Sequence, residues 1–405
     1  MTSTVTAAGS RQTLASAEPP ARWILTIGAV GLALYALFNL VIFVLVYLNP
    51  EARSVVPIYR VGSLGWWAGQ DIFGEGTAGF IYLPSFAVLY TPFALLGAEF
   101  GDIAWRAVSA ALLAYAIAEV FRVVLPRFDT RTRWLIVGTA LLIALPGAAN
   151  SLRNGQATNI LYGLMLLATV HVIERRWWSG AILLGLAFGL KPLAIVYILL
   201  VAALQPKIIP KLIVALVVLM ALPLVNSNPA RALELYGIGI HKVLMSGAPE
   251  AGRWSDITGL MGRFGIVAPE SLLTVARLIT AILTLALGFV ALRRNGRVRG
   301  MINLYALSVV YLMLMSPRTE AQTYLMLSST LAIGSVIGWH VDGERKVPVL
   351  FIVLAVALAA GGLGTAMLRA TDLWWDPLLC LVYLPFLVRD CLTVRPNEPS
   401  AGVGR

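Results

Sequence analysis

The chain has 405 residues, of which 59% are hydrophobic and 13% charged, so its apolar surface exceeds what a soluble domain of this length can hide from water. Its net charge of +11 would indicate nucleic-acid binding in a soluble protein, but many lysines and arginines lie in short loops between apolar segments, where membrane topology explains them. The two cysteines do not have the spacing of a disulfide framework or a metal site. These properties exclude a soluble nucleic-acid-binding protein and predict an all-α polytopic membrane protein.

Residues 1–23 are rich in Ser, Thr and Ala, and the apolar run after them is too long for the core of a signal peptide. We expect them to form a disordered cytoplasmic tail. Apolar runs suited to spanning a bilayer then recur up to residue 390, which predicts one domain (24–390) of about 12 transmembrane helices, followed by a cytoplasmic tail at 391–405. The runs are 24–48, 104–124, 133–149, 158–174, 178–190, 192–206, 209–227, 271–292, 301–316, 322–340, 347–368 and 375–389.

A cytoplasmic N-terminus places the short basic loops on one side of the membrane, as the positive-inside rule requires. This holds only if residues 79–98 do not cross, and Pro84 and Pro92 favour a broken helix along the interface. The first external loop, 49–103, would then contain interfacial helices, and a second long external loop would cover 226–270. The predicted location is the inner or plasma membrane, with both termini in the cytoplasm.

The external segments keep several cations that topology does not explain. Lys191 stands at a helix break before Pro192, where an ammonium needs an anion or a wet cavity, or else snorkels to the interface. Arg153, Asn154 and Gln156 follow a helix that we expect to end near Pro146. They offer a guanidinium and two amides for phosphate or sugar hydroxyls, or they form an ordinary solvated turn.

Three further external segments carry carboxylates. Arg318 and Glu320 flank a turn between two spans, either as a local salt bridge or as part of a site. Asp71 and Glu75 lie among glycines and aromatics that include Trp67, as in a sugar-stacking loop or an interfacial aromatic belt. Asp256 precedes a short helical pattern, as a helix cap would.

Motifs of hydrolases and nucleotide-driven motors are missing. The sequence has no Gly-rich phosphate loop, no HExxH metal motif and no GxSxG elbow, and its three histidines are widely separated.

Several segments, taken in order, resemble the integral membrane glycosyltransferases of the C superfamily, and specifically family 87. Each segment is short and mostly apolar, and their order and spacing carry the resemblance. The segments are YRVGSLGWWAG (59–69), FIYLPSFAVLYTPFALL (80–96), WRAVSAALLAY (105–115), NGQATN (154–159), GLAFGLKP (185–192), SDITGLMGRFG (255–265) and SPRTEAQTYLML (316–327).

The resemblance implies a polyprenyl-phosphate sugar as donor, mannose by family default, and a glycolipid or glycan acceptor on the external face. It also implies the juxtamembrane helices that the charge argument places at residues 79–98. Mannosyltransferases of this family carry a catalytic aspartate early in the first external loop. The corresponding stretch here, RSVVPIYR (53–60), has no carboxylate near Val55 and Val56.

We therefore expect a hexosyltransferase that inverts the anomeric centre, in which a carboxylate takes the acceptor proton and cations stabilise the leaving phosphate. No cofactor or obligatory metal is expected, and the predicted partners are the lipid-linked donor, the acceptor and membrane lipids, without nucleic acid. The candidates are Asp71, then Glu320 and Glu75, as the base; Lys191, Arg318, Arg153 and Arg60 for phosphate; and Asn154, Gln156, Tyr82, Trp67 and Asp256 for sugar or acceptor.

Two other functions remain open. A transporter or flippase of lipid-linked intermediates would use the same cations along a path, but it would favour internal repeats, which the sequence lacks. A non-catalytic subunit of envelope polysaccharide assembly is compatible with the missing aspartate.

Overall fold

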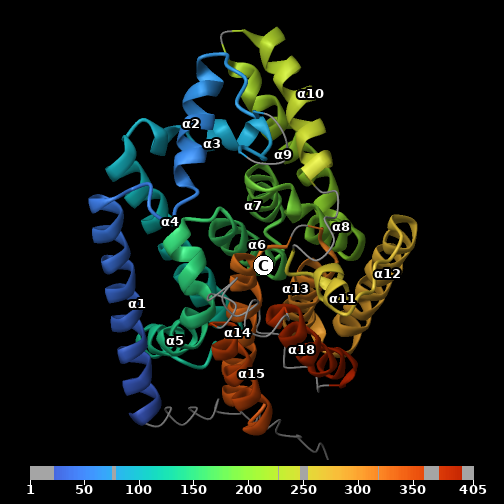
Figure 1. The fold of residues 1–405 in the computed structure, drawn as a ribbon. Helices are drawn as coiled ribbons and strands as arrows, with labels where there is room; N and C mark the ends of the chain where they lie inside the picture. The colour runs from blue at the N-terminus through green and yellow to red at the C-terminus, as the bar shows by residue number, and fades with distance from the viewer. Residues whose placement is uncertain are drawn as a thin grey trace, which may run out of the picture.

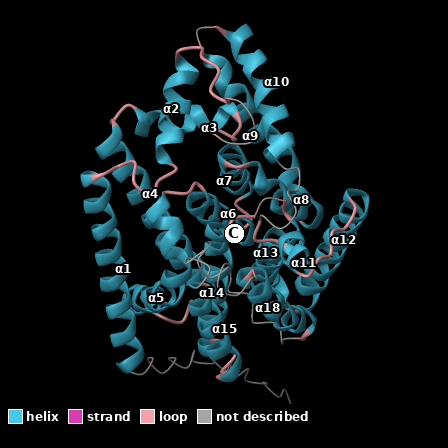
Figure 2. Ribbon diagram, in the orientation of Figure 1, coloured by secondary structure: helices cyan, strands magenta, loops and turns pink. Residues whose placement is uncertain are grey.

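The computed structural model describes residues 22–74, 79–226, 228–246, 254–317, 319–359 and 374–394 (Figure 1). Over these residues the regular structure is helical, and they contain no strand (Figure 2). The described part of the chain is therefore all-α, as its composition predicts. The elements are α1 (Arg22–Leu48), α2 (Val56–Trp67), α3 (Pro84–Ala94), α4 (Ala98–Val124), α5 (Thr130–Asn154), α6 (Thr158–Ile173), α7 (Trp177–Leu190), η1 (Pro192–Ala194), α8 (Ile195–Leu204), η2 (Pro206–Ile208), α9 (Ile209–Ala221), η3 (Leu222–Val225), α10 (Pro229–Ser246), α11 (Ile257–Arg263), α12 (Glu270–Arg294), α13 (Gly296–Met315), η4 (Ala321–Tyr324), α14 (Leu325–His340), α15 (Lys346–Ala357) and α18 (Trp375–Leu392).

Six described helical segments are long and apolar enough to cross a bilayer, which makes the protein a multi-pass membrane protein. They are α1, α4, α5, the run Pro206–Val225 formed by η2, α9 and η3, α12 and α13. Helix α1 lies at one edge of the molecule and α12 at the opposite edge (Figure 1). Helices α6, α7, η1 with α8, and α15 are apolar but shorter, so twelve crossings stay a prediction. The expected tails lie almost entirely outside the described residues, as does the end of the run 347–368.

Helix α5 corrects one expectation. It continues through Pro146 to Asn154, whereas the sequence predicted a helix end near the proline. Proline is tolerated inside membrane helices because neighbouring helices and Ser or Thr side chains satisfy the freed backbone groups. Helix α14 packs against α5 in this region, where Ser328 Oγ donates to the carbonyl oxygen of Ala144 at 3.0 Å. The helix ends instead before Gly155, whose φ of 74° is a left-handed conformation that favours glycine.

Residues 79–98 contain the short helix α3, with Pro84 in its first turn and Pro92 inside it. Its 11 residues measure about 16 Å at the α-helical rise, about half the hydrocarbon thickness of a bilayer. Helix α3 is therefore too short to cross a bilayer by itself, and a position of residues 79–98 along the interface stays a prediction. The two long loops also contain α2 and α10.

Helices α1 and α5 meet through glycines. A Cβ atom at Gly28 would lie 1.9 Å from the carbonyl oxygen of Leu135, and one at Gly138 would lie 2.0 Å from that of Gly28. Only residues without a side chain let the two backbones approach this closely, which is the small-residue packing that membrane helices use in place of a hydrophobic driving force.

The inter-helix turns gather at two ends of the bundle. One, termed the basic end, comprises the turns 125–129, 174–176, 295–299 and 341–345 and the end of α18. There Arg297 Nε donates to the carbonyl oxygen of Ile173 at 2.9 Å, and Arg299 pairs with Asp342 at 3.0 Å.

The other end, termed the long-loop end, comprises the described residues 49–74, 79–97, 155–157, 226, 228–246, 254–269, 316–317 and 319–324. There the amide of Val55 donates to the carbonyl oxygen of Asn154 at 3.1 Å, and the amide of Ser255 to that of Thr319 at 2.8 Å. This division is the one that the predicted topology requires. Which compartment each end faces stays a prediction.

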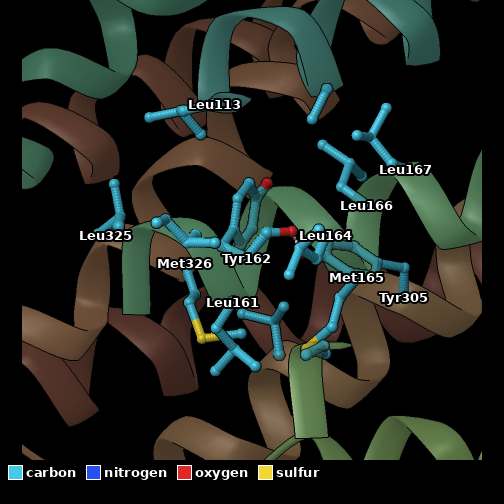
Figure 3. Close-up of a cluster of buried hydrophobic side chains, with 14 of the residues drawn as sticks. Leu113, Leu161, Tyr162, Leu164, Met165, Leu166, Leu167, Tyr305, Leu325 and Met326 are labelled. Atoms are coloured by element: carbon cyan, nitrogen blue, oxygen red, sulfur yellow. Dashed lines mark hydrogen bonds between the residues drawn. The ribbon is translucent and has the colours of Figure 1, made fainter. Parts of the chain in front are cut away.

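The core is centred on α6, which is buried along almost its whole length between α4, α7, α13 and α14. Figure 3 shows Tyr162 of α6 beside Tyr305 of α13, with Met165 and Met326 packed around them. The Tyr305 hydroxyl donates to the carbonyl oxygen of Tyr162 at 3.2 Å, so this polar group is satisfied inside the apolar core.

Candidate functional site

Two turns of the long-loop end meet through one side chain. Gln156, 5% exposed, lies in the turn between α5 and α6 and donates through Nε2 to Glu320 Oε2 at 3.2 Å and to Gln322 Oε1 at 2.6 Å. Both acceptors lie between α13 and α14. The contact brings Gln156 and Glu320, two of the side chains singled out in the sequence, to one place.

Lys191 lies at the predicted helix break. Its backbone is extended (φ −153°, ψ 119°) between α7 and η1, where Pro192 cannot continue the α7 hydrogen-bond ladder. Its Nζ donates to Thr158 Oγ1 at 3.2 Å, and Thr158 is the first residue of α6, two positions after Gln156. The ammonium is therefore beside the turn that binds Glu320.

The lengths of α6 and α7 place these polar groups at some depth. Helix α6 has 16 residues and α7 has 14, about 24 and 21 Å at the α-helical rise. Both are shorter than the hydrocarbon core of about 30 Å. Because both begin or end at the basic end, we expect their polar ends at Thr158 and Lys191 to be recessed from the opposite membrane surface.

Two tyrosines form the wall behind the turn. The hydroxyls of Tyr59 and Tyr82 lie 3.0 Å apart, and the amide of Ala157 donates to the Tyr59 hydroxyl at 3.3 Å. Burial raises the pKa of Tyr59 above its ordinary value, so its phenol keeps its proton at neutral pH. Tyr82 is 7% exposed and stacks on Phe86, with ring centroids 4.5 Å apart. The two tyrosines therefore place uncharged hydroxyl groups behind the Gln156 turn.

A buried arginine that the sequence reasoning did not single out holds the turn. Arg106 of α4, 2% exposed, donates through Nη2 to Ser54 Oγ at 2.8 Å and to the carbonyl oxygen of Arg153 at 3.3 Å. Its neighbour Trp105 donates through Nε1 to the carbonyl oxygen of Gly155 at 2.9 Å. The signal for both was the WR pair inside an apolar helix, because a buried guanidinium requires such partners.

Arg60 forms an ion pair with a buried carboxylate of α4. Its Nη1 lies 2.9 Å from Oδ1 of Asp102, a carboxylate with no exposed side-chain surface, and the Tyr90 hydroxyl lies 3.5 Å from the same oxygen. By contrast, Arg153 Nη1 and Asn154 Oδ1 are buried without a hydrogen-bond partner among the described residues. These two atoms, next in sequence to Gln156, remain available to a ligand.

Three other candidates form no hydrogen bond with Gln156 or Glu320 among the described residues. Asp71 is exposed and accepts a hydrogen bond from the amide of Phe73 at 2.9 Å, in a loop that Lys242 of α10 holds. Trp67 Nε1 donates to Thr91 Oγ1 at 2.7 Å. Asp256 caps α11 by accepting from the amide of Gly259 at 2.8 Å, which is the helix-capping role that the sequence predicts.

Neither Glu75 nor Arg318 belongs to the described residues. In the described part of the chain, no group of three or more His, Cys, Asp and Glu side chains could hold a metal ion. Metal-independent chemistry stays a prediction.

The fold and this constellation define a multi-pass membrane protein in which a carboxylate, two amides and a cation lie near the ends of α6 and α7. Residues 80–317, more than half of the chain, match Glycosyltransferase family 87, and the chain belongs to that family. The match covers Gln156, Thr158 and Lys191, whereas Tyr59 and Glu320 lie outside it.

One similar protein is the polyprenol-phosphate-mannose-dependent alpha-(1-2)-phosphatidylinositol mannoside mannosyltransferase of Mycobacterium tuberculosis (strain ATCC 25618 / H37Rv). It is 27% identical over 201 residues, which cover 44% of this chain and 44% of that relative. No solved structure matches the chain.

Proposed function

We propose that the protein transfers a hexose, with mannose as the first candidate, from a polyprenyl-phosphate donor to a hydroxyl of a glycolipid or glycan acceptor. The reaction takes place at the long-loop end, which faces the outside of the cell membrane. Family membership supports sugar transfer, and the printed name of the similar protein supports the lipid-linked donor. The observation that carries the proposal is the contact of Gln156 with Glu320 beside Lys191.

Glu320 serves as the base in this proposal. Its carboxylate takes the proton of the acceptor hydroxyl as that oxygen attacks the anomeric carbon from the face opposite the phosphate. The bond from the anomeric carbon to the phosphate oxygen breaks, its electron pair leaves with polyprenyl phosphate, and the configuration inverts. Gln156 holds Glu320 in place. Glu320 takes precedence over Asp71 because no hydrogen bond or ion pair joins Asp71 to Gln156, Lys191 or Glu320.

Lys191 and Arg153 stabilise the departing phosphate, and Arg318 adds a third cation. The isoprenoid chain needs an apolar environment next to a polar end, and the recessed ends of α6 and α7 provide one. Asn154, adjacent to Gln156, offers an unpartnered amide oxygen to a sugar hydroxyl. The aspartate absent from residues 53–60 is replaced functionally by Glu320, while Ser54 in that stretch binds Arg106.

The test is transfer of radiolabelled mannose from polyprenyl-phosphate mannose to lipid acceptors by the full chain in proteoliposomes. We expect Glu320→Gln to lower kcat by about 10²–10⁴, the range for loss of a general base. Lys191→Met should lower kcat/KM for the donor. Glu270→Gln is the matched control, because Glu270 is an exposed carboxylate at the same end with no role in the site.

Two outcomes contradict the proposal. If Asp71→Asn abolishes transfer while Glu320→Gln keeps wild-type turnover, the base is Asp71. If wild-type protein moves the labelled lipid across the bilayer without forming a glycosidic product, the protein is a transporter of lipid-linked sugars.

A further inference from the structure

A cavity lies at the basic end, opposite the candidate site. Its volume is about 90 Å³, and α13, α14, α15 and α18 enclose it. Arg299, Asn303 and Ala306 of α13 line one side of it. Because these residues follow one another at spacings of four and three, they lie on one helix face. Nothing in the proposed transfer reaction uses this cavity.

Two hydrogen-bond donors on that face have no partner in the described part of the chain. Asn303 is 3% exposed, and its Nδ2 has no hydrogen-bond partner among the described residues. The same holds for Arg299 Nη1, although the other nitrogens of this guanidinium are paired. The two residues stand one helical turn apart, about 6 Å along α13. Unpaired buried donors are costly, so the cavity has the chemistry to hold oxygen acceptors at two successive depths.

The mouth of the cavity carries both signs of charge. Arg299 binds Asp342 at 3.0 Å and Asp390 at 3.0 Å, and Arg389 lies 3.4 Å from Glu344. These two cations and three carboxylates all line the cavity. Cations and carboxylates therefore lie side by side at the mouth, which favours a head group that carries an ammonium as well as an anionic group.

The interior beyond Asn303 is apolar. Ala306, Ile333 and Phe351 line it, and its floor is the tyrosine cluster around Tyr305 that Figure 3 shows. An apolar cavity of about 150 Å³ holds a benzene ring, so this smaller cavity suits part of one hydrocarbon chain rather than a whole lipid. From mouth to floor the order is charged groups, a neutral donor, and hydrocarbon.

We propose that this cavity binds one acyl chain of an aminophospholipid of the phosphatidylethanolamine type. The ammonium lies at Asp342 and Glu344, and the phosphate lies at Arg389 and the free Nη1 of Arg299. The ester carbonyl accepts from Asn303 Nδ2, and the first part of the acyl chain enters beside Ala306. The site stands independently of the proposed sugar transfer.

The experiment is a native mass spectrometry titration of the delipidated full chain with phosphatidylethanolamine, phosphatidylglycerol and oleate. We expect one phosphatidylethanolamine to bind per chain, about tenfold more tightly than phosphatidylglycerol, and Asn303→Leu to weaken it about tenfold, as for one lost hydrogen bond. Ala306→Leu should abolish binding by filling the cavity. Glu344→Gln should reduce the preference over phosphatidylglycerol.

Val353→Leu is the matched control, because Val353 belongs to α15 but its side chain is 57% exposed on the outer surface. It should bind like the wild type. Equal affinity of the wild type for phosphatidylethanolamine and phosphatidylglycerol, or tighter binding of oleate, overturns the proposal whether or not the variants fold. Unchanged affinity in a folded Ala306→Leu variant overturns the assignment to this cavity.

Discussion

Arg60 Nη1 lies 2.9 Å from Asp102 Oδ1, in an ion pair that joins α2 of the first long loop to the start of α4. The side chain of Asp102 is fully buried and that of Arg60 is 14% exposed. This pairing gives Arg60 a role in holding the long-loop end to the bundle.

The ion pair predicts an asymmetric effect of substitution. Asp102→Ala should destabilise the protein by about 3–5 kcal/mol, because it leaves a guanidinium buried without its partner. The measurement is the free energy of unfolding in mixed micelles of mild detergent and dodecyl sulfate. The double variant Arg60→Met/Asp102→Leu should recover most of the loss. A single variant as stable as the wild type would show that the pair does not form.

The glycine contact between α1 and α5 predicts intolerance of side chains. Gly138→Val should destabilise the protein by about 1–3 kcal/mol or more, since its Cβ would lie 2.0 Å from a backbone oxygen of α1. Gly237→Ala in α10 is the control, because a Cβ there meets nothing within 4 Å and alanine favours helix. The measurement is the melting temperature, which should fall for Gly138→Val but not for Gly237→Ala. Equal melting temperatures would mean that α1 and α5 do not touch at this point.

Arg106 is expected to resist conservative replacement. A lysine keeps the charge but cannot form the fork that reaches both Ser54 and the carbonyl oxygen of Arg153. Arg106→Lys should lower the free energy of unfolding by about 1–3 kcal/mol, the cost of unsatisfied buried groups. The exposed Arg131→Lys is the control and should change nothing measurable.

In the transfer assay, Arg106→Lys should lower kcat more than it raises the donor KM, because it displaces the turn that holds Glu320. An unchanged kcat in a destabilised variant would restrict Arg106 to a structural role.

Tyr59 predicts a pH dependence of stability. Its pKa is raised in the folded state by burial, so above pH 10 the unfolded chain loses a proton that the folded chain keeps. The contribution of Tyr59 to the free energy of unfolding is fully present below pH 10 and falls by about 1.4 kcal/mol per pH unit above it. Tyr59→Phe should make the alkaline loss of stability shallower, whereas Tyr47→Phe, at a 57% exposed position, should not. Identical slopes for the wild type and Tyr59→Phe would contradict the burial of Tyr59.

Local sequence determined the elements of this protein. The lengths of the apolar runs predicted the long helices, and Lys191-Pro192 predicted the break between α7 and η1. The prolines at 84 and 92 predicted that α3 is short. These features depend on hydrophobicity and on the missing proline amide, which act within a few residues. The same reasoning failed at Pro146, because α14 packs against α5 there, and membrane helices tolerate an internal proline where a neighbouring helix packs.

The site required the tertiary structure. Gln156 and Glu320 are 164 positions apart in the sequence, and no local pattern predicts that the Gln156 amide donates to the Glu320 carboxylate. The sequence predicted phosphate binding for both Lys191 and Arg60. In the structure Arg60 pairs with a buried carboxylate, and Lys191 lies beside the Gln156 turn. The sequence alone shows that cations occur outside the basic loops. Only the packing of α2, α4, α6 and α7 decides which of them is paired with a buried carboxylate and which lies beside the Gln156 turn, since pairing depends on contacts between distant segments.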